Sequence, residues 1–295
     1  MKRLFSVLLF ITVVMCARAQ WPGPHSRIET DSLRSEVLDA FRAYTVYLPA
    51  EFDANPTKTY PVLYLLHGMG GVNTSWFLDQ RAGEVMDQLT ASGEAAPMVV
   101  VSPNAGGNVM QGHWNGYFNM PGWNYEDFFF SEFMPFIEKK YRCGGSKEQR
   151  AIAGLSMGGG GSTSYAQRHP EMFSSVYAMS ALMDIPDFPG AQNPTPMSPA
   201  DKTAILTKAV KDLSCIKYVA NADDKTKESL RSVKWFVDCG DDDFLLDRNI
   251  EFFQAMRNAG IPCQFRVRDG GHTNEYWHTA LFTALPFVTR NFGCK

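Results

Sequence analysis

The sequence predicts an α/β protein with a mostly parallel central sheet and helices on both faces of that sheet. Short apolar runs alternate with longer stretches of helical spacing along the chain. Several runs are apolar at consecutive positions, as in strands that are buried on both faces, and they end in glycine, proline or polar residues. This rhythm favours crossover connections between neighbouring parallel strands.

The chain begins with a segment that has the features of a secretory signal. A basic start precedes an apolar run from Leu4 to Met15, and the small-x-small sequence Ala17-Arg18-Ala19 follows. The apolar run is shorter than the ~20 residues that a membrane-spanning helix needs. We therefore expect residues 1–19 to be a signal peptide, and export to the periplasm or outside the cell without a membrane anchor. Residues 20–295 are expected to form one domain.

Charge and cysteine content limit the classes of partner and cofactor. Loss of residues 1–19 would leave 25 basic against 31 acidic residues, which argues against nucleic acid or an anionic membrane as a partner. Five cysteines would remain without a C-x-x-C spacing, so the sequence indicates neither a zinc nor a redox centre. One or two disulfides are compatible with this count, and their pairing is open. The five are Cys143, Cys215, Cys239, Cys263 and Cys294.

Strands and helices are expected in turn along the first half of the chain. Residues 32–38 and 43–48 alternate in polarity and would pair as strands around a turn at Asp39, and Pro49 would end the second strand. The elements expected after them are a buried strand at 60–66, a helix at 80–90, a strand at 98–102 and an amphipathic helix at 125–141 that Pro135 kinks.

The second half continues the alternation, with one interruption. The expected strands are 150–153, 173–179, 233–239 and 264–268, and the expected helices are 160–168, 247–259 and 275–292. Between them, residues 184–231 contain several prolines and a lysine-rich amphipathic stretch without a convincing strand. This interval is either a cap-like insertion beside the functional site or a surface excursion.

The motif with the strongest functional meaning is Gly154-Leu155-Ser156-Met157-Gly158. It lies between an expected strand and an expected helix, which is the context of a G-x-S-x-G nucleophile elbow. The backbone of the serine is strained in such a turn and its neighbours approach closely, so side chains at 154 and 158 would clash. The sequence therefore predicts that Ser156 is a catalytic nucleophile.

An activated serine needs a general base and a group that orients the base, and in this architecture the chain order is serine, acid, histidine. His272 follows the last expected strand in a glycine loop, whereas His278 lies in an expected helix, so His272 is the predicted base. The acid is expected after the 233–239 strand. There the adjacent Asp241, Asp242 and Asp243 share one loop, and spacing alone does not choose among them.

Tetrahedral intermediates also need backbone N–H donors. One is expected from Met157, directly after the nucleophile, and the other from Met69 in the glycine-rich loop that follows the 60–66 strand. His67 in that loop is expected to be structural. Aromatic side chains near these motifs are candidates for stacking on a substrate, although core packing explains each of them equally well. They are Trp76, Trp123, Tyr276 and Trp277.

Several stretches together resemble the esterase D-like esterases, and within these the bacterial feruloyl and acetylxylan esterases of carbohydrate esterase family one. They are Leu65 to Gly71 with Trp76, Tyr125-Glu126-Asp127, Pro135 to Arg142, and Gly154 to Gly159. The resemblance runs from about Ser32 to the C-terminus. It implies an α/β-hydrolase fold with the cap-like insertion at about 184–231.

The resemblance also assigns the acid and the histidine. The family's aspartate, three residues after a glycine, falls on Asp243, and the family's histidine, five residues before a tryptophan, falls on His272. The chain departs from the pattern at Asn274, where relatives often carry an aromatic residue, so the shape of the acyl pocket is open.

The activity that the resemblance implies is that of an exported serine esterase. It would cleave feruloyl or acetyl esters, small or attached to plant cell-wall xylan, through an acyl-enzyme and without a metal or cofactor. The alternatives within this fold are a short-chain carboxylesterase, a siderophore esterase and an acyltransferase. The presence of Ser156, Asp243 and His272 disfavours a non-catalytic carbohydrate-binding relative.

Overall fold

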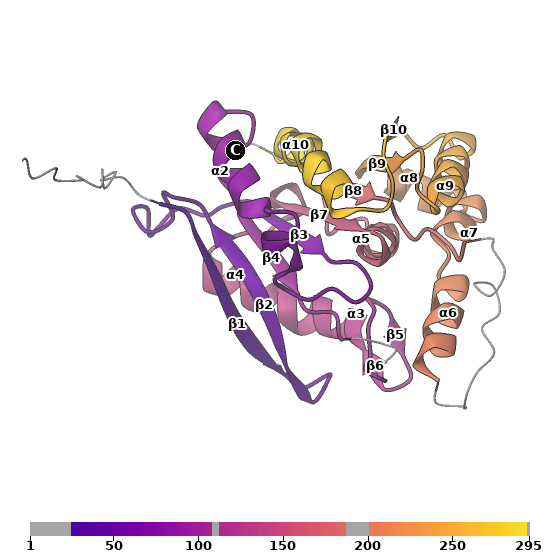
Figure 1. Cartoon of the computed structure of the whole chain (residues 1–295), viewed down its shortest axis with the longest axis horizontal. Helices are drawn as coiled ribbons and strands as arrows, with labels where there is room; N and C mark the ends of the chain where they lie inside the picture. Colours follow the sequence, from indigo (N-terminus) through magenta and orange to yellow (C-terminus); the bar gives the residue numbers. More distant parts are fainter. Residues whose placement is uncertain (1–24, 108–111, 187–200, 294–295) are drawn as a thin grey trace, which may run out of the picture.

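A computed structural model describes residues 25–107, 112–186 and 201–293, and an eight-stranded sheet runs through the middle of the molecule (Figure 1). The strand order is β1-β2-β4-β3-β7-β8-β9-β10, and only the pairs that involve β2 are antiparallel. The predicted mostly parallel sheet is thus confirmed. The expected signal peptide and Cys294 lie outside the described residues. The strands are β1 (Arg27–Ser35), β2 (Ala40–Leu48), β3 (Val62–Leu66), β4 (Val99–Pro103), β7 (Arg150–Leu155), β8 (Ser175–Met179), β9 (Lys234–Gly240) and β10 (Cys263–Arg268).

The first strand pair differs most from the prediction. β1 begins at Arg27 and ends at Ser35, and Asp39 in the turn has a φ of +47°. Glu36 and Val37 were expected to continue the strand, but their N–H groups donate to the Glu132 carboxylate at 3.0 and 3.1 Å. An acceptor from a distant helix therefore ends the pairing earlier than the residue pattern suggested.

Helices cover both faces of the sheet, and each face has its own core. Leu63 and Leu65 of β3 face one core, and Val62, Tyr64 and Leu66 face the other, as the period of a strand requires. α1, α2 and α10 build the first core, and the remaining helices belong to the second. Figure 1 shows α2 and α10 on the upper side of the sheet and α3 and α4 on the lower side. The helix bounds are α1 (Ser75–Leu78), α2 (Ala82–Ser92), α3 (Tyr125–Phe128), α4 (Met134–Tyr141), α5 (Met157–Arg168), α6 (Lys202–Asp212), α7 (Cys215–Ala220), α8 (Asp224–Arg231), α9 (Leu246–Asn258) and α10 (Asn274–Asn291).

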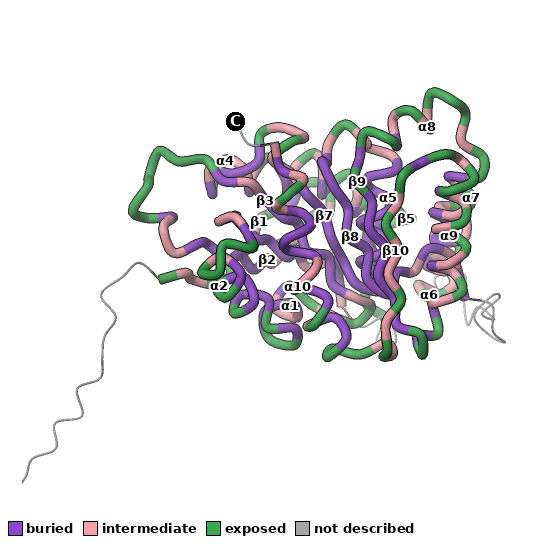
Figure 2. The backbone as a smooth tube through the Cα atoms, turned by 90° about the horizontal axis from the view of Figure 1, so that it is seen from above, coloured by how far each residue is buried: buried purple, intermediate pink, exposed green. Residues whose placement is uncertain are grey.

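Burial follows the strands more closely than the helices. Every residue of β3, β4 and β8 is buried, which explains the uninterrupted apolar sequence of β3 and the largely apolar sequences of the other two. Figure 2 shows the central strands buried along their length, with exposed backbone concentrated in the loops and on the outer helix faces. The residues at the ends of these strands therefore project from a rigid base.

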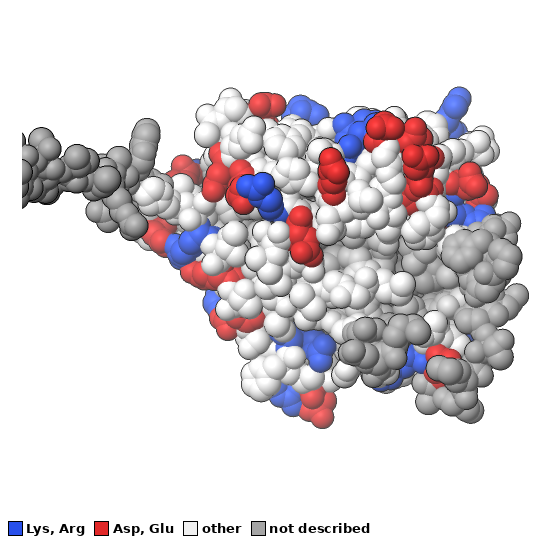
Figure 3. Space-filling model, in the orientation of Figure 1, with Lys and Arg blue, Asp and Glu red and all other residues white. Residues whose placement is uncertain are grey.

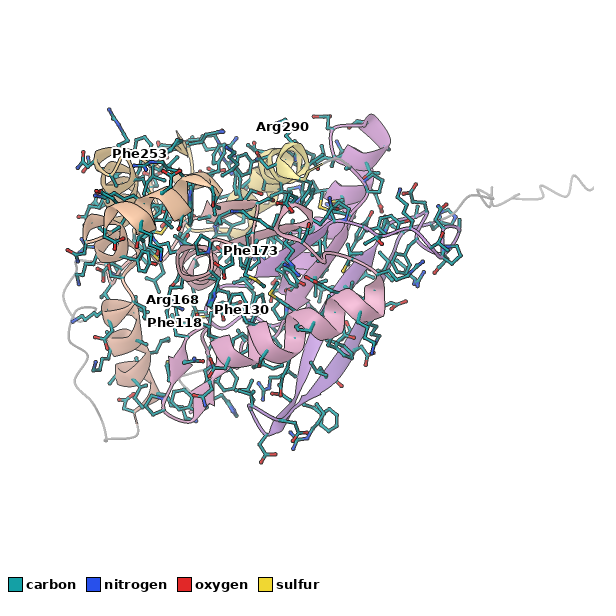
Figure 4. The ribbon with its side chains drawn as sticks, turned by 180° about the vertical axis from the view of Figure 1, so that it is seen from behind. Phe118, Phe130, Arg168, Phe173, Phe253 and Arg290 are labelled. Carbon is teal, nitrogen blue, oxygen red and sulfur yellow. The ribbon has the colours of Figure 1, made fainter. Side chains whose placement is uncertain are left out.

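The expected helix at 125–141 contains an irregular segment. A π-helical stretch from Phe129 to Phe133 joins α3 to α4, directly before Pro135, which cannot donate a backbone hydrogen bond. The Phe130 ring lies 4.1 Å from the His169 ring and 6.1 Å from Phe173, measured between centroids. Figure 4 shows Phe130, Phe118 and Arg168 together beside the end of α5.

The described part of the 184–231 interval contains helices α6, α7 and α8, and no strand. α7 packs against α5 and α9, and α6 lies beside a two-stranded ribbon formed by β5 (Asn119–Met120) and β6 (Trp123–Asn124). The Lys202 ammonium lies 4.9 Å from the centre of the Trp114 ring at this junction. Among the described helices, none is long and apolar enough to cross a membrane.

The four described cysteines carry free thiols. Burial raises the pKa of each thiol, to about 12 for Cys215 and Cys263. The disulfides that the cysteine count allowed are therefore not formed among these four side chains.

Candidate active site

The turn between β7 and α5 has the geometry of a nucleophile elbow. Ser156 has a φ of +53°, and its N–H group donates to the Met179 carbonyl at 2.9 Å. A Cβ atom on Gly154 would lie 2.2 Å from the Gly158 carbonyl oxygen, and one on Gly158 would lie 2.1 Å from the Leu66 carbonyl oxygen. The two glycines are therefore required by close backbone approach, as the motif predicts.

Three loops bring the serine, the histidine and one aspartate together. The Ser156 Oγ atom lies 3.0 Å from His272 Nε2. The other ring nitrogen, His272 Nδ1, lies 2.9 and 3.1 Å from the two carboxylate oxygens of Asp243. These side chains follow β7, β10 and β9, whose carboxyl ends meet at one edge of the sheet. The three side chains thus form a continuous chain of hydrogen bonds from the hydroxyl group to the carboxylate. Activation of a serine nucleophile requires such a chain.

The three adjacent aspartates have different partners. Asp243 is buried and contacts His272, whereas Asp241 accepts a hydrogen bond from the Gly270 N–H group at 3.0 Å. Asp242 is exposed, and its own N–H group donates to the Gly270 carbonyl at 3.1 Å. The structure thus brings Asp243 to the histidine and uses its two neighbours to join the loops.

The carboxylate of Asp243 is held in its ionised form. Burial acts to raise its pKa, but hydrogen bonds from His272, the Leu245 N–H group and the Ser180 hydroxyl outweigh burial, so the pKa lies below its ordinary value. An ionised carboxylate can only accept hydrogen bonds, and the Asp243 oxygens face His272 Nδ1. The neutral His272 ring therefore carries its proton on Nδ1. His272 Nε2 is then free to accept the proton of the Ser156 hydroxyl.

His67 has the structural role that the sequence analysis expected. Its side chain is buried, its Nδ1 atom lies 2.8 Å from the Gly68 carbonyl oxygen, and its Nε2 atom accepts the Ala105 N–H group at 3.0 Å. Burial lowers its pKa to about 4, although the hydrogen bond to Gly68 acts in the opposite direction. Both ring nitrogens are occupied by backbone groups, so His67 holds the loop that carries Met69.

A pocket of about 330 Å³ opens beside Ser156 and His272. Its walls include the loop His67–Gly71, the polar side chains of Asp79, Gln80 and Asn274, and the Trp277 ring. Met69 belongs to this wall, and its side chain is 67% exposed. Met157 is the first residue of α5, where backbone N–H groups have no acceptor within the helix. The two expected N–H donors thus belong to segments that adjoin Ser156.

Three of the four aromatic residues that were expected to bind substrate are not among the described residues that line this pocket. Trp76, Trp123 and Tyr276 are at most 5% exposed, and their rings pack in the cores. Little of each ring is open to a ligand, and the assignment of these three residues to substrate binding stays a prediction. Trp277 does line the pocket. Its ring meets the His272 ring edge-on at 4.8 Å, and its Nε1 atom donates to Ser180 Oγ at 3.0 Å.

Two features of the site were missed by reasoning from the sequence. Phe244 is 57% exposed, and its ring centre lies 4.6 Å from that of His272, so an exposed apolar ring stands beside this histidine. On another side, Gln80 Nε2 donates to Asn274 Oδ1 at 2.7 Å and closes the wall between α1 and α10. The position of Phe244 directly after Asp243 was a signal for the first feature. The second feature joins residues that are 194 positions apart, and no local pattern predicts it.

On the described surface in Figure 3, acidic and basic side chains are interspersed around the periphery. Within residues 25–107, 112–186 and 201–293, no group of three histidine, cysteine, aspartate or glutamate side chains is placed to hold a metal ion.

Comparison with known proteins identifies the family. The model of the family described as "Putative esterase" matches residues 35–288, which include every residue of the site. The chain belongs to this esterase family. The strand order, the elbow and the order of serine, acid and histidine are those of the α/β-hydrolase fold.

This esterase has relatives among both solved structures and curated sequences. A solved ferulic acid esterase is 62% identical, with a TM-score of 0.86, and the match covers 91% of this chain and 99% of that one. An endo-1,4-beta-xylanase/feruloyl esterase of Xylanibacter ruminicola is 28% identical over 263 residues, which are 87% of this chain but 30% of that protein. An acetyl esterase of Caldicellulosiruptor saccharolyticus is 24% identical over 81% of this chain and 86% of its own length. The described domain is therefore a carboxylic ester hydrolase.

Proposed function

We propose that this esterase cleaves carboxylic esters through an acyl-enzyme on Ser156, and that its acyl group is feruloyl or a related hydroxycinnamoyl group carried by plant cell-wall xylan. The observation that carries the chemistry is the hydrogen-bonded chain from Ser156 Oγ through His272 to Asp243, with distances of 3.0 and 2.9 Å. The substrate class is supported by the 62% identity to a solved ferulic acid esterase.

In the proposed first half-reaction, Ser156 Oγ attacks the ester carbonyl carbon while its proton passes to His272 Nε2. The tetrahedral oxyanion accepts hydrogen bonds from the Met157 and Met69 N–H groups. Asp243 stabilises the imidazolium by accepting a hydrogen bond from its Nδ1–H group, and the carboxylate stays ionised. Collapse of the intermediate releases the alcohol, which takes the Nε2 proton, and leaves the acyl group on Ser156.

The second half-reaction repeats these steps with water. His272 removes a proton from the water molecule, the hydroxide adds to the acyl carbon, and the second tetrahedral intermediate expels Ser156 Oγ, which recovers its proton from His272. The products are a carboxylic acid and the free enzyme. No atom of a metal or cofactor enters either half of this scheme.

The apolar groups beside the site support an aromatic acyl group. The exposed Phe244 ring and the exposed Met69 side chain flank the serine–histidine pair and present hydrophobic surface to solvent. A hydroxycinnamoyl ring has a flat apolar face that such side chains would cover. An acetyl group would leave this surface in water. Acetyl ester cleavage is nevertheless the second candidate, because the acetyl esterase relative is matched over 86% of its length.

The test compares the wild type with Ser156→Ala on 4-nitrophenyl acetate, methyl ferulate and acetylated xylan. We expect turnover of methyl ferulate by the wild type, with a higher kcat/KM than acetate release from xylan, and no turnover by Ser156→Ala. Equal rates for the two proteins would contradict the mechanism. If methyl ferulate were inert while acetylated xylan was cleaved, the acetyl assignment would replace the feruloyl one.

We also propose that the esterase is exported, since Met1 to Ala19 has the basic, apolar and small-residue regions of a secretory signal. Mass spectrometry of protein secreted by an expressing cell is expected to give an N-terminus at Gln20. Retention of Met1 in protein that stays in the cytoplasm would contradict export.

A further inference from the structure

A buried carboxylate outside the catalytic chain lies beneath the loop that carries His272. Asp238 of β9 is fully buried, and the proposed reaction does not use it. Its Oδ1 atom accepts the Tyr276 hydroxyl at 2.6 Å, and its Oδ2 atom accepts the Tyr177 hydroxyl at 2.6 Å. Arg266 also donates to Oδ2, and the Arg268 Nε atom lies 3.7 Å from Oδ1. An isolated buried carboxylate is costly, so these partners are required for it to persist.

The partners of Asp238 stand at both ends of the histidine loop. Arg266 and Arg268 belong to β10, directly before the loop, and Tyr276 belongs to the first turn of α10, directly after it. Arg268 also donates to the Tyr276 carbonyl at 2.5 Å, and its guanidinium lies 3.6 Å from the centre of the Tyr276 ring. The two ends of the loop are therefore joined to each other as well as to Asp238.

The Tyr276 ring also supports the loop from below. A Cβ atom on Gly270 would lie 2.8 Å from this ring, which shows how closely the loop backbone rests on it. Thr273 caps α10 by accepting the Tyr276 N–H group at 3.3 Å. His272 lies between these two contacts, so a displacement of Tyr276 would move the imidazole relative to Ser156.

We propose that Asp238 and Tyr276 are positioning residues that set the place of His272 through the hydrogen bond between their side chains. The proposal rests on the proposed esterase function, because the consequence of the hydrogen bond is read in the geometry of the serine–histidine pair. A misplacement of reacting groups by about 1 Å is enough to cost about 100-fold in rate.

The two tyrosines at Asp238 provide a matched pair of variants. Tyr276→Phe and Tyr177→Phe each remove one buried hydrogen bond to the same carboxylate and keep the aromatic ring. Tyr177 lies on β8 and its ring packs against Phe236 and Phe287. Its hydroxyl also accepts a hydrogen bond from Arg266 at 3.3 Å, so Tyr177→Phe loses this contact to β10 as well and is the more demanding control. Replacement of Asp238 itself would leave two arginines without their anion and is expected to destabilise the sheet, so the tyrosine variants carry the test.

The first measurement is hydrogen exchange of the backbone amides in residues 269–273, which requires no turnover. We expect exchange about tenfold faster in Tyr276→Phe than in the wild type, and within about twofold of the wild type in Tyr177→Phe. The second measurement is turnover of 4-nitrophenyl acetate well below both unfolding temperatures. We expect kcat to fall about tenfold in Tyr276→Phe with KM within about twofold, and Tyr177→Phe to keep the wild-type kcat.

The outcomes separate this proposal from the proposed function. Equal exchange rates or equal kcat values in the two variants would overturn the positioning role, because both lose the same kind of hydrogen bond. Faster exchange in Tyr276→Phe alone supports it. Failure of the wild type to cleave any ester would instead reject the proposed function, and the exchange measurement would still decide how the loop is held.

Discussion

The loop after β3 and the loop after β10 both place a histidine beside glycines at the same edge of the sheet. The two histidines differ in burial and in the groups that their ring nitrogens contact. His67 is buried, with backbone partners at 2.8 and 3.0 Å on its two nitrogens. The side chain of His272 is 21% exposed and lies between a carboxylate and a hydroxyl group. A histidine whose nitrogens meet only the backbone supports a loop, whereas one that meets an acid and a nucleophile can transfer protons.

The environment also shifts the pKa of His67 and of Asp243. The pKa of His67 is lowered to about 4 by burial, so this ring stays neutral under conditions in which an ordinary histidine gains a proton. The pKa of Asp243 is lowered as well, despite its burial, because it accepts hydrogen bonds from His272 and its neighbours. The loop after β3 thus holds a histidine that stays neutral, and the histidine of the loop after β10 meets an ionised carboxylate. Four variants test this contrast.

The largest expected effect is on the histidine that meets the acid. His272→Ala removes the proposed base, and we expect kcat on 4-nitrophenyl acetate to fall by about 10⁵- to 10⁶-fold. The free energy of unfolding should fall by about 1 to 3 kcal/mol, because the buried Asp243 carboxylate loses its hydrogen bond from His272. Steady-state kinetics and urea unfolding measure the two quantities. Retention of more than about one hundredth of the wild-type kcat would show that His272 is not the base.

The second-largest effect is expected from the carboxylate that contacts His272. Asp243→Asn cannot hold the imidazole in the correct tautomer, and we expect a fall in kcat of about 10⁴-fold. Asp242→Asn is the matched control: it makes the same change in the adjacent exposed residue, and its kcat should stay within about twofold of the wild type. If the two variants lost activity equally, the loop as a whole rather than the Asp243 carboxylate would orient His272.

The third effect is on stability and comes from the other histidine. His67 has a pKa of about 4 in the folded protein and an ordinary value of about 6.5 when unfolded, so the unfolded chain binds more protons between these limits. The stabilisation is complete above pH 6.5 and is lost as the pH falls through 4. It amounts to about 3 kcal/mol, since one pKa unit corresponds to about 1.4 kcal/mol.

Urea unfolding of the wild type and of His67→Gln at several pH values between 7 and 4 measures the contribution of His67 to the free energy of unfolding. Glutamine gains no proton in this range, so the variant is expected to lose less free energy of unfolding than the wild type over the same interval. Parallel curves for the two proteins would mean that His67 does not titrate differently in the folded and unfolded states.

The smallest effect concerns the exposed ring beside His272. Phe244→Ala removes this ring. We expect KM for methyl ferulate to rise about fivefold, which corresponds to about 1 kcal/mol of binding free energy, while KM for 4-nitrophenyl acetate stays within about twofold of the wild-type value. Phe41→Ala is the control, because Phe41, 68% exposed against 57% for Phe244, is an exposed ring on the β1–β2 hairpin. A similar rise in KM for both esters would assign Phe244 to the support of His272 instead of the acyl group.

Much of the fold was predictable because its signals are local. Continuous apolar runs identified β3 and β4, and the 150–168 stretch identified the strand, turn and helix around Ser156. The β5–β6 ribbon was not anticipated, because strands of two residues show no periodicity. The early end of β1 was not anticipated either, because the acceptor that ends it, Glu132, lies 95 and 96 residues away along the chain.

By itself the sequence determined the elbow, the order of its partners and the parallel sheet that brings them to one edge. These depend on glycine sterics, on residue period and on the meeting of strand ends, all of which are properties of short segments. Spacing left three aspartates open, and the family resemblance singled out Asp243, which the structure places against His272. Only the tertiary structure decided which tryptophan lines the pocket and where Asp238 is anchored. Those outcomes depend on distances and burial between segments such as Ser156 and His272, which are 116 residues apart and meet only when the sheet has formed.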